Sequence, residues 1–570
     1  MSDKTPLKVV LCWHMHQPHY QDPVSGGYQL PWTYLHGIKD YVDMAAHLEA
    51  VKGARAVVNF APILLEQLGD YAEQIRRHLQ DGESIHDPLL AQLDSPVAPS
   101  GDDERLALIQ DCLRANREHL IERFPQYRRL ARIADWLVEE PEAMMYVDDQ
   151  FLADLVTWYH LAWMGETVRR EDSRVRGLQE KGAGFTVEDR RFLLSIIGEL
   201  LADIPNRYRR LAEEGKVELS VTPYAHPIAP LLLNFESAQE AYPESDLPQA
   251  EEYPDGEGRV RWHIREGMAT FQQHFGFSPV GCWPAEGAIS EGTLRLLGEA
   301  GFDWAATGEG VLGHSLGKKY DKYGSDVRHT LCHPYKVPAS RTACFFRDDE
   351  LSDLIGFQYS NWHADDAVAD LIHRLEEIGK ATADHPEPVV PIILDGENAW
   401  EHYPENGYYF LRSLYQQLAD HPSLELTTFG GCTEAKVQTN KLTHLVAGSW
   451  VYGTLSTWIG DKDKNRGWDM LVEAKQAYDQ ALAAGKMDEE TVEAATRQLA
   501  ICEGSDWFWW FGDYNPADIV RDFERLYRLH LSRLYRLIDV QPPEYLAHTF
   551  AHGSGHPAHG GVMRPGQPHE

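Results

Sequence analysis

Two acidic side chains follow apolar stretches in a way that suits acid–base chemistry. The apolar run over residues 389–394 has the length of a strand and stops at Asp395, and a shorter run over 279–283 leads to Glu286. A buried parallel strand delivers its last residues to the carboxyl edge of the sheet, where α/β proteins bind ligands. On residues 389–400 alone, a strand followed by a polar turn explains the pattern equally well. The second acid favours a pair of carboxyl groups that face one ligand.

Paired carboxyl groups are the catalytic groups of most glycosidases. In the retaining mechanism they lie about 5–5.5 Å apart, so that one attacks the sugar and the other protonates the leaving oxygen. Two negative charges at that distance disfavour double ionisation, so one of the acids keeps its proton. The flat rings of Trp283, Trp400 and Trp458 suit stacking on sugar faces, although aromatic rings are also ordinary core material.

Histidines gather where two predicted strands end. His14, His16 and His19 follow the apolar run over residues 8–13, and His226 follows the run over 216–222. Imidazoles at strand ends supply hydrogen-bond donors to a polar pocket, and they also bind metal ions. Histidines that only hydrogen-bond the backbone of a loop give the same pattern. The sequence therefore leaves open a sugar-binding pocket, a metal centre and a structural loop.

Apolar runs alternate with amphipathic stretches, which predicts an α/β fold built on a parallel barrel or a wound sheet. Seven strands are expected over residues 8–13, 54–60, 216–222, 279–283, 303–307, 353–359 and 389–395. Residues 424–428 form a possible eighth strand, and residues 330–346 alternate like a hairpin. Pro391 lacks the N–H of a central strand, so we expect the seventh strand to begin after it or to bulge there.

Two long stretches have helical character. Residues 63–211 predict a helical subdomain inserted after the second strand, and further helices are expected over residues 469–538. An aromatic run over residues 507–511 lies among these helices, and Asp506 is the polar neighbour that we expect to face a ligand. Residues 548–570 are rich in Gly, Pro and His and are expected to be disordered.

The charge balance and the cysteines narrow the class of protein. The 570-residue chain has 53 Lys and Arg against 88 Asp and Glu, a net charge of −35, which argues against nucleic acid and anionic membranes as partners. Its seven cysteines include no Cys-x-x-Cys pair, so neither a disulfide framework nor a thiolate zinc site is expected. Neither a signal peptide nor an apolar run of membrane-spanning length is evident, so we expect a cytoplasmic protein.

At these residues the chain resembles glycoside hydrolase family 57. Five short segments are similar to the family's motifs, in the same order: His16-Gln17-Pro18; Glu218 with Tyr224 and His226; Trp283-Pro284-Ala285-Glu286; Asp395-Gly396-Glu397; and Trp450–Asp461. Ser505-Asp506-Trp507 resembles a further segment that the family places near its substrate. The resemblance covers roughly residues 8 to 540.

The resemblance implies a (β/α)7 barrel with a helical C-terminal region, and a retaining enzyme that acts on α-glucans without a cofactor or a catalytic metal. Glu286 would be the nucleophile and Asp395 the general acid/base. Substrate contacts would come from His14, His16, Glu218, His226, Trp283, Arg347, Trp400, Trp458 and Asp506. The expected division is a barrel over residues 1–430 with an insertion at about 63–211, a helical domain over 431–547 that contributes to the active-site cleft, and a tail over 548–570.

Within the family, the chain looks most like the α-amylase and amylopullulanase group, which predicts hydrolysis of α-1,4 bonds in malto-oligosaccharides, starch or glycogen. A 4-α-glucanotransferase or an α-glucan branching enzyme would use the same two acids, and would differ in whether water or a sugar hydroxyl resolves the intermediate. Two other classes stay open: a metal-dependent carbohydrate hydrolase or deacetylase built on His14 and His16, and a glucan-binding protein without turnover.

Overall fold

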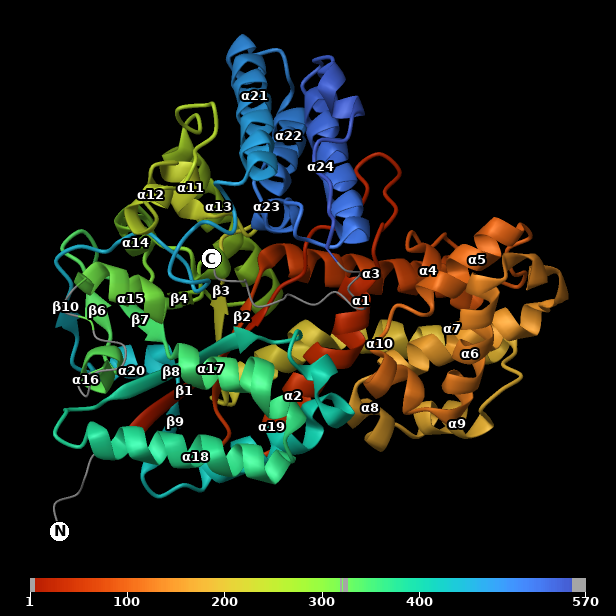
Figure 1. The fold of residues 1–570 in the computed structure, drawn as a ribbon, viewed down its shortest axis with the longest axis horizontal. Coiled ribbons are helices and arrows are strands. Elements are labelled where there is room, and N and C mark those ends of the chain that lie inside the picture. Colours follow the sequence, from red (N-terminus) through yellow and green to blue (C-terminus); the bar gives the residue numbers. More distant parts are fainter. Residues whose placement is uncertain (1–5, 318–319, 321–326, 556–570) are drawn as a thin grey trace.

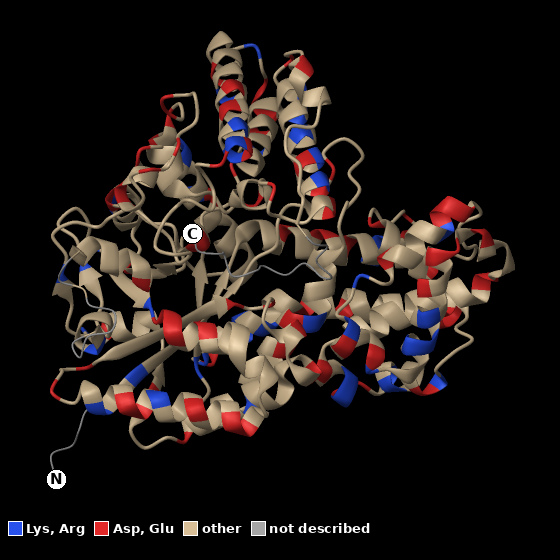
Figure 2. Ribbon diagram, viewed as in Figure 1, with Lys and Arg blue, Asp and Glu red and all other residues tan. Residues whose placement is uncertain are grey.

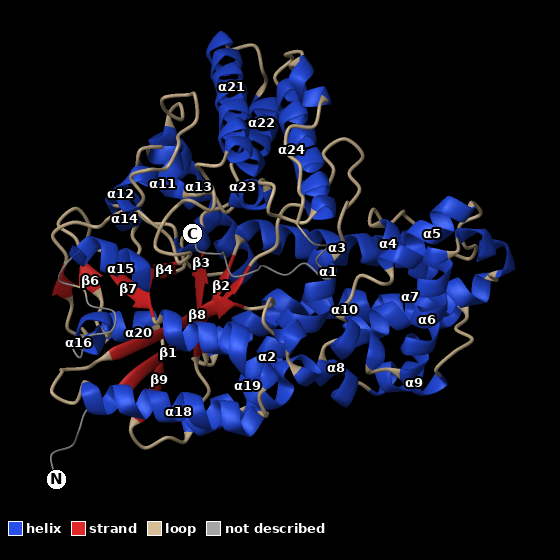
Figure 3. Cartoon of the chain, viewed as in Figure 1, coloured by secondary structure: helices blue, strands red, loops and turns tan. Residues whose placement is uncertain are grey.

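Seven parallel strands form the centre of the fold, in the order β7-β5-β4-β3-β2-β1-β8 (Figures 1 and 3). The computed structural model describes residues 6–317, 320 and 327–555. The strands are β1 (Leu7–Met15), β2 (Ala56–Phe60), β3 (Val217–Val221), β4 (Gly281–Cys282), β5 (Trp304–Gly308), β7 (Ala343–Arg347) and β8 (Val389–Asp395). All of β1 is buried, as expected for a parallel strand covered on both faces.

The two outer strands of this order meet and close the sheet. The backbone N–H of Asp348 donates to the carbonyl of Pro391 at 2.8 Å, and Nε of Arg347 donates to the carbonyl of Ile393 at 2.8 Å. These contacts make the sheet a barrel, and the predicted α/β fold with a (β/α)7 barrel is confirmed. The seam also explains Pro391, which lies inside β8: the N–H of Ile393, two residues on, donates to the Ser352 hydroxyl and not to a strand. The backbone N–H that proline lacks would point towards this seam. No neighbouring strand forms a ladder of hydrogen bonds there, so Pro391 interrupts none.

The predicted sixth strand over residues 353–359 is wrong. The chain there is helical, with α17 (Asp349–Asp353), a π-helical turn (Leu354–Gln358) and a 3-10 turn (Tyr359–Asn361). The Asp348 side chain accepts from the N–H of Leu351 and caps this helix. The sixth barrel strand is instead β7, which the sequence placed in a hairpin. Part of that hairpin exists, because β6 (Tyr335–Lys336) pairs antiparallel with β7 at Tyr335 and Cys344.

Two short strands extend the sheet beyond the barrel. The predicted eighth strand is β9 (Leu424–Thr427), which pairs with the first residues of β1, from Leu7 to Val10. β9 lies on the side of β1 opposite β8. It pairs with the start of β1, and β2 pairs with the same side of β1 from Cys12 onward. β10 (Asn440–Lys441) pairs with β6.

Helices surround the barrel (Figure 3). Those between and after its strands include α1 (Trp32–His36), α2 (Val42–Ala50), α11 (Ala229–Leu233), α12 (Ser237–Ala241), α13 (Gly256–Phe275), α14 (Glu291–Ala300), α15 (Glu309–Leu316), α16 (Val327–Leu331), α18 (Ala364–Ala381), α19 (Tyr408–Ala419) and α20 (Phe429–Glu434). Charged residues lie mainly on helices and loops, and the strands carry few (Figure 2). All seven cysteines are buried and unpaired. None of the described helices is both long and apolar enough to cross a lipid bilayer.

The stretch between β2 and β3 is helical, as predicted. It contains α3 (Pro62–Asp81), α4 (Pro88–Ala91), α5 (Asp102–Asp111), α6 (Pro125–Glu139), α7 (Asp149–Trp163), α8 (Glu166–Glu171), α9 (Ser173–Lys181) and α10 (Val187–Glu213), and most of it extends to the right in Figure 1.

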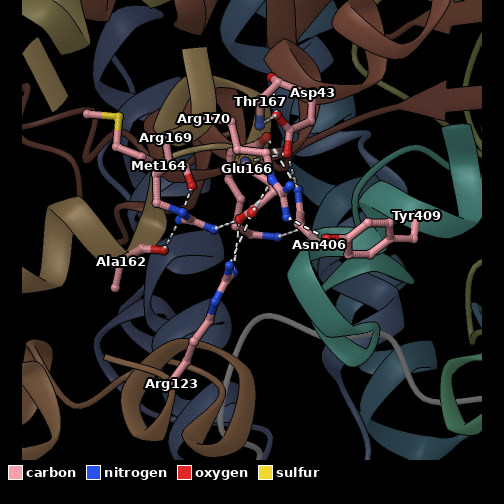
Figure 4. A network of polar contacts seen from close by, with 11 residues as sticks. Asp43, Arg123, Ala162, Met164, Glu166, Thr167, Arg169, Arg170, Asn406 and Tyr409 are labelled. Atoms are coloured by element: carbon pink, nitrogen blue, oxygen red, sulfur yellow. Dashed lines mark hydrogen bonds and ion pairs between the residues drawn. The ribbon is translucent and has the colours of Figure 1, made fainter. Parts of the chain in front are cut away.

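A buried polar network fastens these helices to the barrel (Figure 4). Asp43 of α2 accepts the N–H groups of Glu166 at 2.7 Å and Thr167 at 2.9 Å, and the amide of Asn406 at 2.9 Å. Glu166 in turn pairs with Arg169 at 2.8 Å and with Arg123 and Arg170. One carboxylate therefore joins the barrel helix α2, the insertion and the segment after β8.

Four helices near the C-terminus stand together at the top of Figure 1. They are α21 (Lys462–Ala484), α22 (Glu489–Cys502), α23 (Ser505–Trp510) and α24 (Ala517–Leu537). Residues 548–555 of the predicted tail are described, whereas 556–570 lie outside the described residues. The division into a barrel over 1–430 and a helical domain over 431–547 stays a prediction.

Candidate active site

Glu286 lies in a strained turn directly after the short strand β4. Its backbone is left-handed, with φ of +56°, and φ of Gly287 is +57°. A non-glycine residue in this region costs of order 1–3 kcal/mol, and such strain gathers at functional sites. Trp450 holds the turn, because its backbone N–H donates to the Glu286 carbonyl at 3.2 Å and its indole Nε1 donates to the carboxylate Oε2 at 3.0 Å. The Glu286 residue is only 6% exposed.

Asp395 is the last residue of β8 and pairs in register with His14 of β1. Its Oδ2 accepts a hydrogen bond from the amide of Asn398 at 2.8 Å. Burial raises the pKa of Asp395 to about 6, although Asn398 and the nearby charges of His16 and Arg347 favour its ionised form.

Glu286 and Asp395 line one cavity of about 260 Å³ and interact electrostatically. Burial, and then the negative charge of Asp395, raise the pKa of Glu286 well above its ordinary value. The negative charge of Asp395 thus opposes the ionisation of Glu286. Two carboxyl groups that face one cavity are the catalytic groups that a double-displacement reaction needs.

Three of the predicted histidines stack beside this pair. The ring centroids of His16 and His226 are 3.7 Å apart at an interplanar angle of 11°, and His14 lies nearly parallel to both. Nε2 of His14 faces Nε2 of His226 at 3.1 Å. Burial lowers the pKa of His14 to about 3 and lowers the pKa of His226, so both rings are neutral at physiological pH.

Neighbouring strands and the C-terminal helices orient these rings. Nδ1 of His14 bonds Oδ1 of Asn59 on β2 at 2.7 Å, and Nδ1 of His226 bonds the Ser505 hydroxyl at 2.7 Å. His16 bonds the Asp506 carboxylate at 2.9 Å. Asp506 also lines the cavity, so α23 completes a site that the barrel strands begin; its contact with a ligand stays a prediction.

The stacked rings have nitrogens within 4.8 Å of one another, which raises the question of a metal centre. An ion bound to a ring nitrogen lies close to the plane of that ring, because the lone pair lies in the plane. The planes of His16 and His226 are nearly parallel at a centroid distance of 3.7 Å, so no single ion lies in both. The arrangement favours a hydrogen-bonding surface for hydroxyl groups over a metal-dependent hydrolase.

Of the nine predicted substrate contacts, His14, His16 and Asp506 line the cavity, and Trp400 and Trp458 are two of the six that do not. Trp400 is 1% exposed; it packs edge-on to Trp13 in the core, and its indole N–H donates to the Gly396 carbonyl. Trp458 is fully buried, 5.8 Å from Trp509 between ring centroids. Neither ring has a free face for a sugar.

Glu218 lies near the amino-terminal end of β3, whereas the ligand-facing residues follow the carboxyl ends of the strands. Its carboxylate accepts from the Trp304 indole at 2.6 Å and from the backbone N–H of Gly430 at 2.7 Å. These contacts fill the barrel interior, so its predicted substrate contact is not supported.

Trp283 and Arg347 lie one layer behind the cavity. Trp283 is fully buried and packs edge-on to Trp450 at 5.3 Å, and the Arg347 guanidinium lies 5.5 Å from the ring of Trp450. Arg347 is fixed by Asp349 and Asp353. Both residues support Trp450, which the sequence assigned to no role although it begins the fifth motif.

Other cavity residues had weak signals in the sequence. Glu397 belongs to the fourth motif and received no role; it is 3% exposed, and Gln17 donates to its Oε1 at 3.2 Å. One wall of the cavity carries the apolar side chains Leu30, Trp32, Trp509, Trp510, Ile519 and Phe523, and the charged residues Arg114, Asp518 and Asp522 also line the cavity. The run of aromatic residues after Asp506 was the only hint of this wall, and it reads equally well as core.

The chain is similar to proteins that act on α-glucans. The model of the family described as Glycosyl hydrolase family 57 matches residues 10–443. A 1,4-alpha-glucan branching enzyme of Thermococcus kodakarensis, TK1436, is 20% identical over 274 residues, which are 44% of this chain and 37% of that protein. The alignment thus spans little more than a third of that relative.

Solved structures share the fold over most of the chain. The crystal structure of the Thermococcus branching enzyme superposes with a TM-score of 0.57 at 16% identity, covering 93% of this chain and 90% of that one. A branching enzyme of Pyrococcus horikoshii gives a TM-score of 0.57 at 15% identity, with 98% and 99% covered. The α-amylase AmyC of Thermotoga maritima gives 0.56 at 14% identity, with 94% and 93% covered. At these identities the likeness shows the fold alone, but the family model covers most of the sequence, and the chain therefore belongs to glycosyl hydrolase family 57.

Proposed function

We propose that this chain cleaves α-1,4-glucosidic bonds of α-glucans by double displacement, with Glu286 as the nucleophile and Asp395 as the general acid/base. The observation that carries the proposal is the pair of buried carboxyl groups in one cavity, where the charge of Asp395 acts on Glu286. The indole N–H of Trp450 donates to the Glu286 carboxylate, which favours the ionised form that attacks. Burial raises the pKa of Asp395 to about 6, which brings its proton closer to the pH range in which a general acid works.

The reaction then has two balanced steps. A carboxylate oxygen of Glu286 bonds to the anomeric carbon as the bond from that carbon to the bridging oxygen breaks, and Asp395 transfers its proton to that oxygen. An acceptor hydroxyl next loses its proton to Asp395 and attacks the anomeric carbon, and the ester to Glu286 breaks. His14 and His16 line the cavity and would contact the hydroxyls of the bound sugar, whereas His226 supports them from behind.

The covalent step has a direct test. Asp395→Ala would react with α-maltosyl fluoride, because fluoride leaves without protonation, and would then stall for lack of a base. We expect intact-mass analysis to show one maltosyl adduct and peptide mapping to place it on Glu286. Glu286→Gln combined with Asp395→Ala serves as the matched control and should show no adduct. An adduct on another residue would overturn the assignment, and so would release of the inverted sugar by the wild type.

A second candidate is transfer to a sugar acceptor, as in a glucanotransferase or branching enzyme. The apolar outer wall of the cavity favours it, since Trp509, Trp510 and Phe523 offer aromatic surface to a second sugar and reduce access of water. A time course on maltoheptaose separates the two outcomes. Rising reducing ends with only shorter products indicate hydrolysis, whereas longer or branched products at constant reducing ends indicate transfer.

A further inference from the structure

The short helix α23 contributes to the cavity from both of its ends. Its first residues, Ser505 and Asp506, bond the active-site histidines, and its last residues, Trp509 and Trp510, line the apolar wall of the cavity. The last carbonyls of any α-helix lack a partner within the helix, and in a helix this short they are most of its carbonyls. The donors that these carbonyls find elsewhere therefore help to fix the two tryptophan rings.

Lys464 and Asn515 supply those donors. Nζ of Lys464 donates to the carbonyl of Phe508 at 2.7 Å and, in a longer contact, to that of Trp509 at 3.5 Å. Nδ2 of Asn515 donates to the carbonyls of Trp509 and Trp510, both at 3.1 Å. The last three carbonyls of α23 are thus all satisfied by side chains from outside the helix.

The same lysine also reaches the stretch of turns over residues 450–461. Its Nζ donates to the carbonyl of Thr457 in a short contact. Trp450, the first residue of this stretch, donates to the Glu286 carboxylate. The Nζ of Lys464 thus joins the two segments that complete the site beside the barrel strands, one that contacts a catalytic acid and one that forms the apolar wall.

The position of Lys464 is unfavourable for a lysine on local grounds. It lies in the first turn of α21, where the helix dipole disfavours a positive charge, and it is 1% exposed. Over the part of the chain that the structure describes, its hydrogen bonds all go to backbone carbonyls and none to a carboxylate. Burial lowers the pKa of Lys464 to about 7, although Asp461 and Asp463 favour its charge. Residues that break local rules in this way are expected at functional sites.

We infer that Lys464 is a positioning residue, whose Nζ holds the C-terminal end of α23 and so sets Trp509 and Trp510 at the cavity wall. The N-terminal end of the helix has anchors of its own, because Ser505 and Asp506 bond histidines of the barrel. This role rests on the proposed function, in which the two rings offer a surface to a second sugar. We therefore expect Lys464 to affect the binding of long substrates and not the attack on the anomeric carbon.

Steady-state kinetics of the full-length protein on two substrates test this role. Maltoheptaose has sugars on both sides of the bond that is cleaved, whereas α-maltosyl fluoride has only fluoride on the leaving side. The variants are Lys464→Met, which keeps the stem of the side chain and removes Nζ, and Asn515→Ala, which removes the second donor. The matched control is Lys475→Met, because Lys475 is equally buried on α21 but pairs with Asp479. Melting temperatures of all four proteins report on folding.

We expect Lys464→Met to raise KM for maltoheptaose about tenfold, the equivalent of one lost aromatic contact, with little change in kcat. For α-maltosyl fluoride, kcat/KM should stay within about twofold, because that substrate places no sugar on the wall. Asn515→Ala should show the same difference between the substrates, and Lys475→Met should show none.

Three results would overturn the positioning role: an unchanged KM for maltoheptaose in folded Lys464→Met, equal losses on both substrates, or the same rise of KM in Lys475→Met. If Lys464→Met does not fold, Asn515→Ala decides by the same criteria. A wild type that acts on neither substrate would overturn the proposed function, and this role with it. A wild type that acts on both, beside a Lys464→Met that matches it, would overturn this role alone.

Discussion

One hydrogen-bond partner of the Glu286 carboxyl group favours its ionised form, whereas the rest of its surroundings disfavour that form. The indole N–H of Trp450 donates to it, whereas burial and the charge of Asp395 raise its pKa. Trp450 is itself supported by Trp283 and Arg347. The hydrogen bonding of the Glu286 carboxyl group therefore depends on a side chain 164 positions further along the sequence.

Trp450→Phe removes that donor and keeps most of the ring. A hydrogen bond to a charged group contributes about 1.5–3 kcal/mol, so we expect kcat/KM to fall roughly 10- to 100-fold. The pKa of Glu286 should rise, because the lost bond favoured the ionised form, and the acidic limb of the pH profile should move to higher pH. The half-exposed Trp362 provides the control Trp362→Phe. A fall in kcat/KM without a shift of the acidic limb would show that Trp450 acts by packing alone.

Glu397 is a buried carboxyl group beside Asp395 whose Oε2 has no hydrogen-bond partner. Burial and the charge of Asp395 raise its pKa, which favours the protonated form. Glu397→Gln is uncharged like that form, and we expect it to retain activity within about tenfold, the equivalent of one neutral hydrogen bond. Asp395→Asn should lose about 10²–10⁴-fold, as expected for a general acid. Equal losses in kcat/KM for the two variants would mean that Glu397 acts in its ionised form.

At the scale of elements, α23 is held against the barrel by a buried ion pair. Glu503, just before the helix, accepts from Arg259 at 2.7 Å and from His263 at 2.7 Å. Two residues further on, Ser505 bonds His226, and Asp506 bonds His16. The ion pair thus fixes the segment that completes the cavity.

Glu503→Gln leaves the buried charge of Arg259 without its partner, which costs about 3–5 kcal/mol of unfolding free energy. Burial raises the pKa of Glu503, but Arg259 and the hydrogen bonds more than offset this and lower the pKa to about 2. Because the unfolded group has a pKa of about 4.3, its contribution is complete above that pH and is lost as the pH falls toward 2. Urea unfolding between pH 2 and 6 should therefore show a flatter pH dependence for the variant. Glu493→Gln, at an exposed position of α22, should keep the wild-type slope.

The elements that carry the two acids were predictable because their signals are local. The apolar runs that lead to Asp395 and to Glu286 predict strands from neighbouring residues alone, without contacts to distant parts of the chain. The stretch over residues 353–359 was misassigned because a short apolar run fits a strand and a buried helix equally well, and the cap at Asp348 decided between them.

The contacts of the site were less predictable because they join distant segments. Trp400 and Trp458 have the same local character as Trp509, yet only Trp509 lines the cavity. What separates them is their packing, Trp400 against Trp13 of β1 and Trp458 beneath Trp509. The bond from Trp450 to Glu286 has no local signature for the same reason. Residue types predicted the kind of site, whereas tertiary packing decided which residues line it.

At the scale of the whole molecule, the Asp43 network joins the barrel, the insertion and the segment after β8 (Figure 4). In Asp43→Asn, an amide N–H would face the backbone N–H groups that Asp43 accepts. We expect this to lower the unfolding free energy by about 3 kcal/mol, the lower end of the cost of breaking a buried ion pair. Limited proteolysis should then cut the insertion before the barrel. Asp81→Asn, at an exposed position of α3, is the control. An unchanged cleavage pattern in Asp43→Asn would show that apolar packing alone holds the insertion.

The bond between His16 and Asp506 joins residues 490 positions apart. A ribosome makes β1 among the first segments of the chain, but β8, which covers one side of β1, is made only about 375 residues later, and Asp506 later still. Domains fold as units during synthesis, so the growing chain holds an apolar strand with one open edge for most of that time. The cavity of a nascent chain is incomplete until translation is almost finished. Throughout that interval the exposed edge of β1 can bind chaperones or pair with other chains and aggregate.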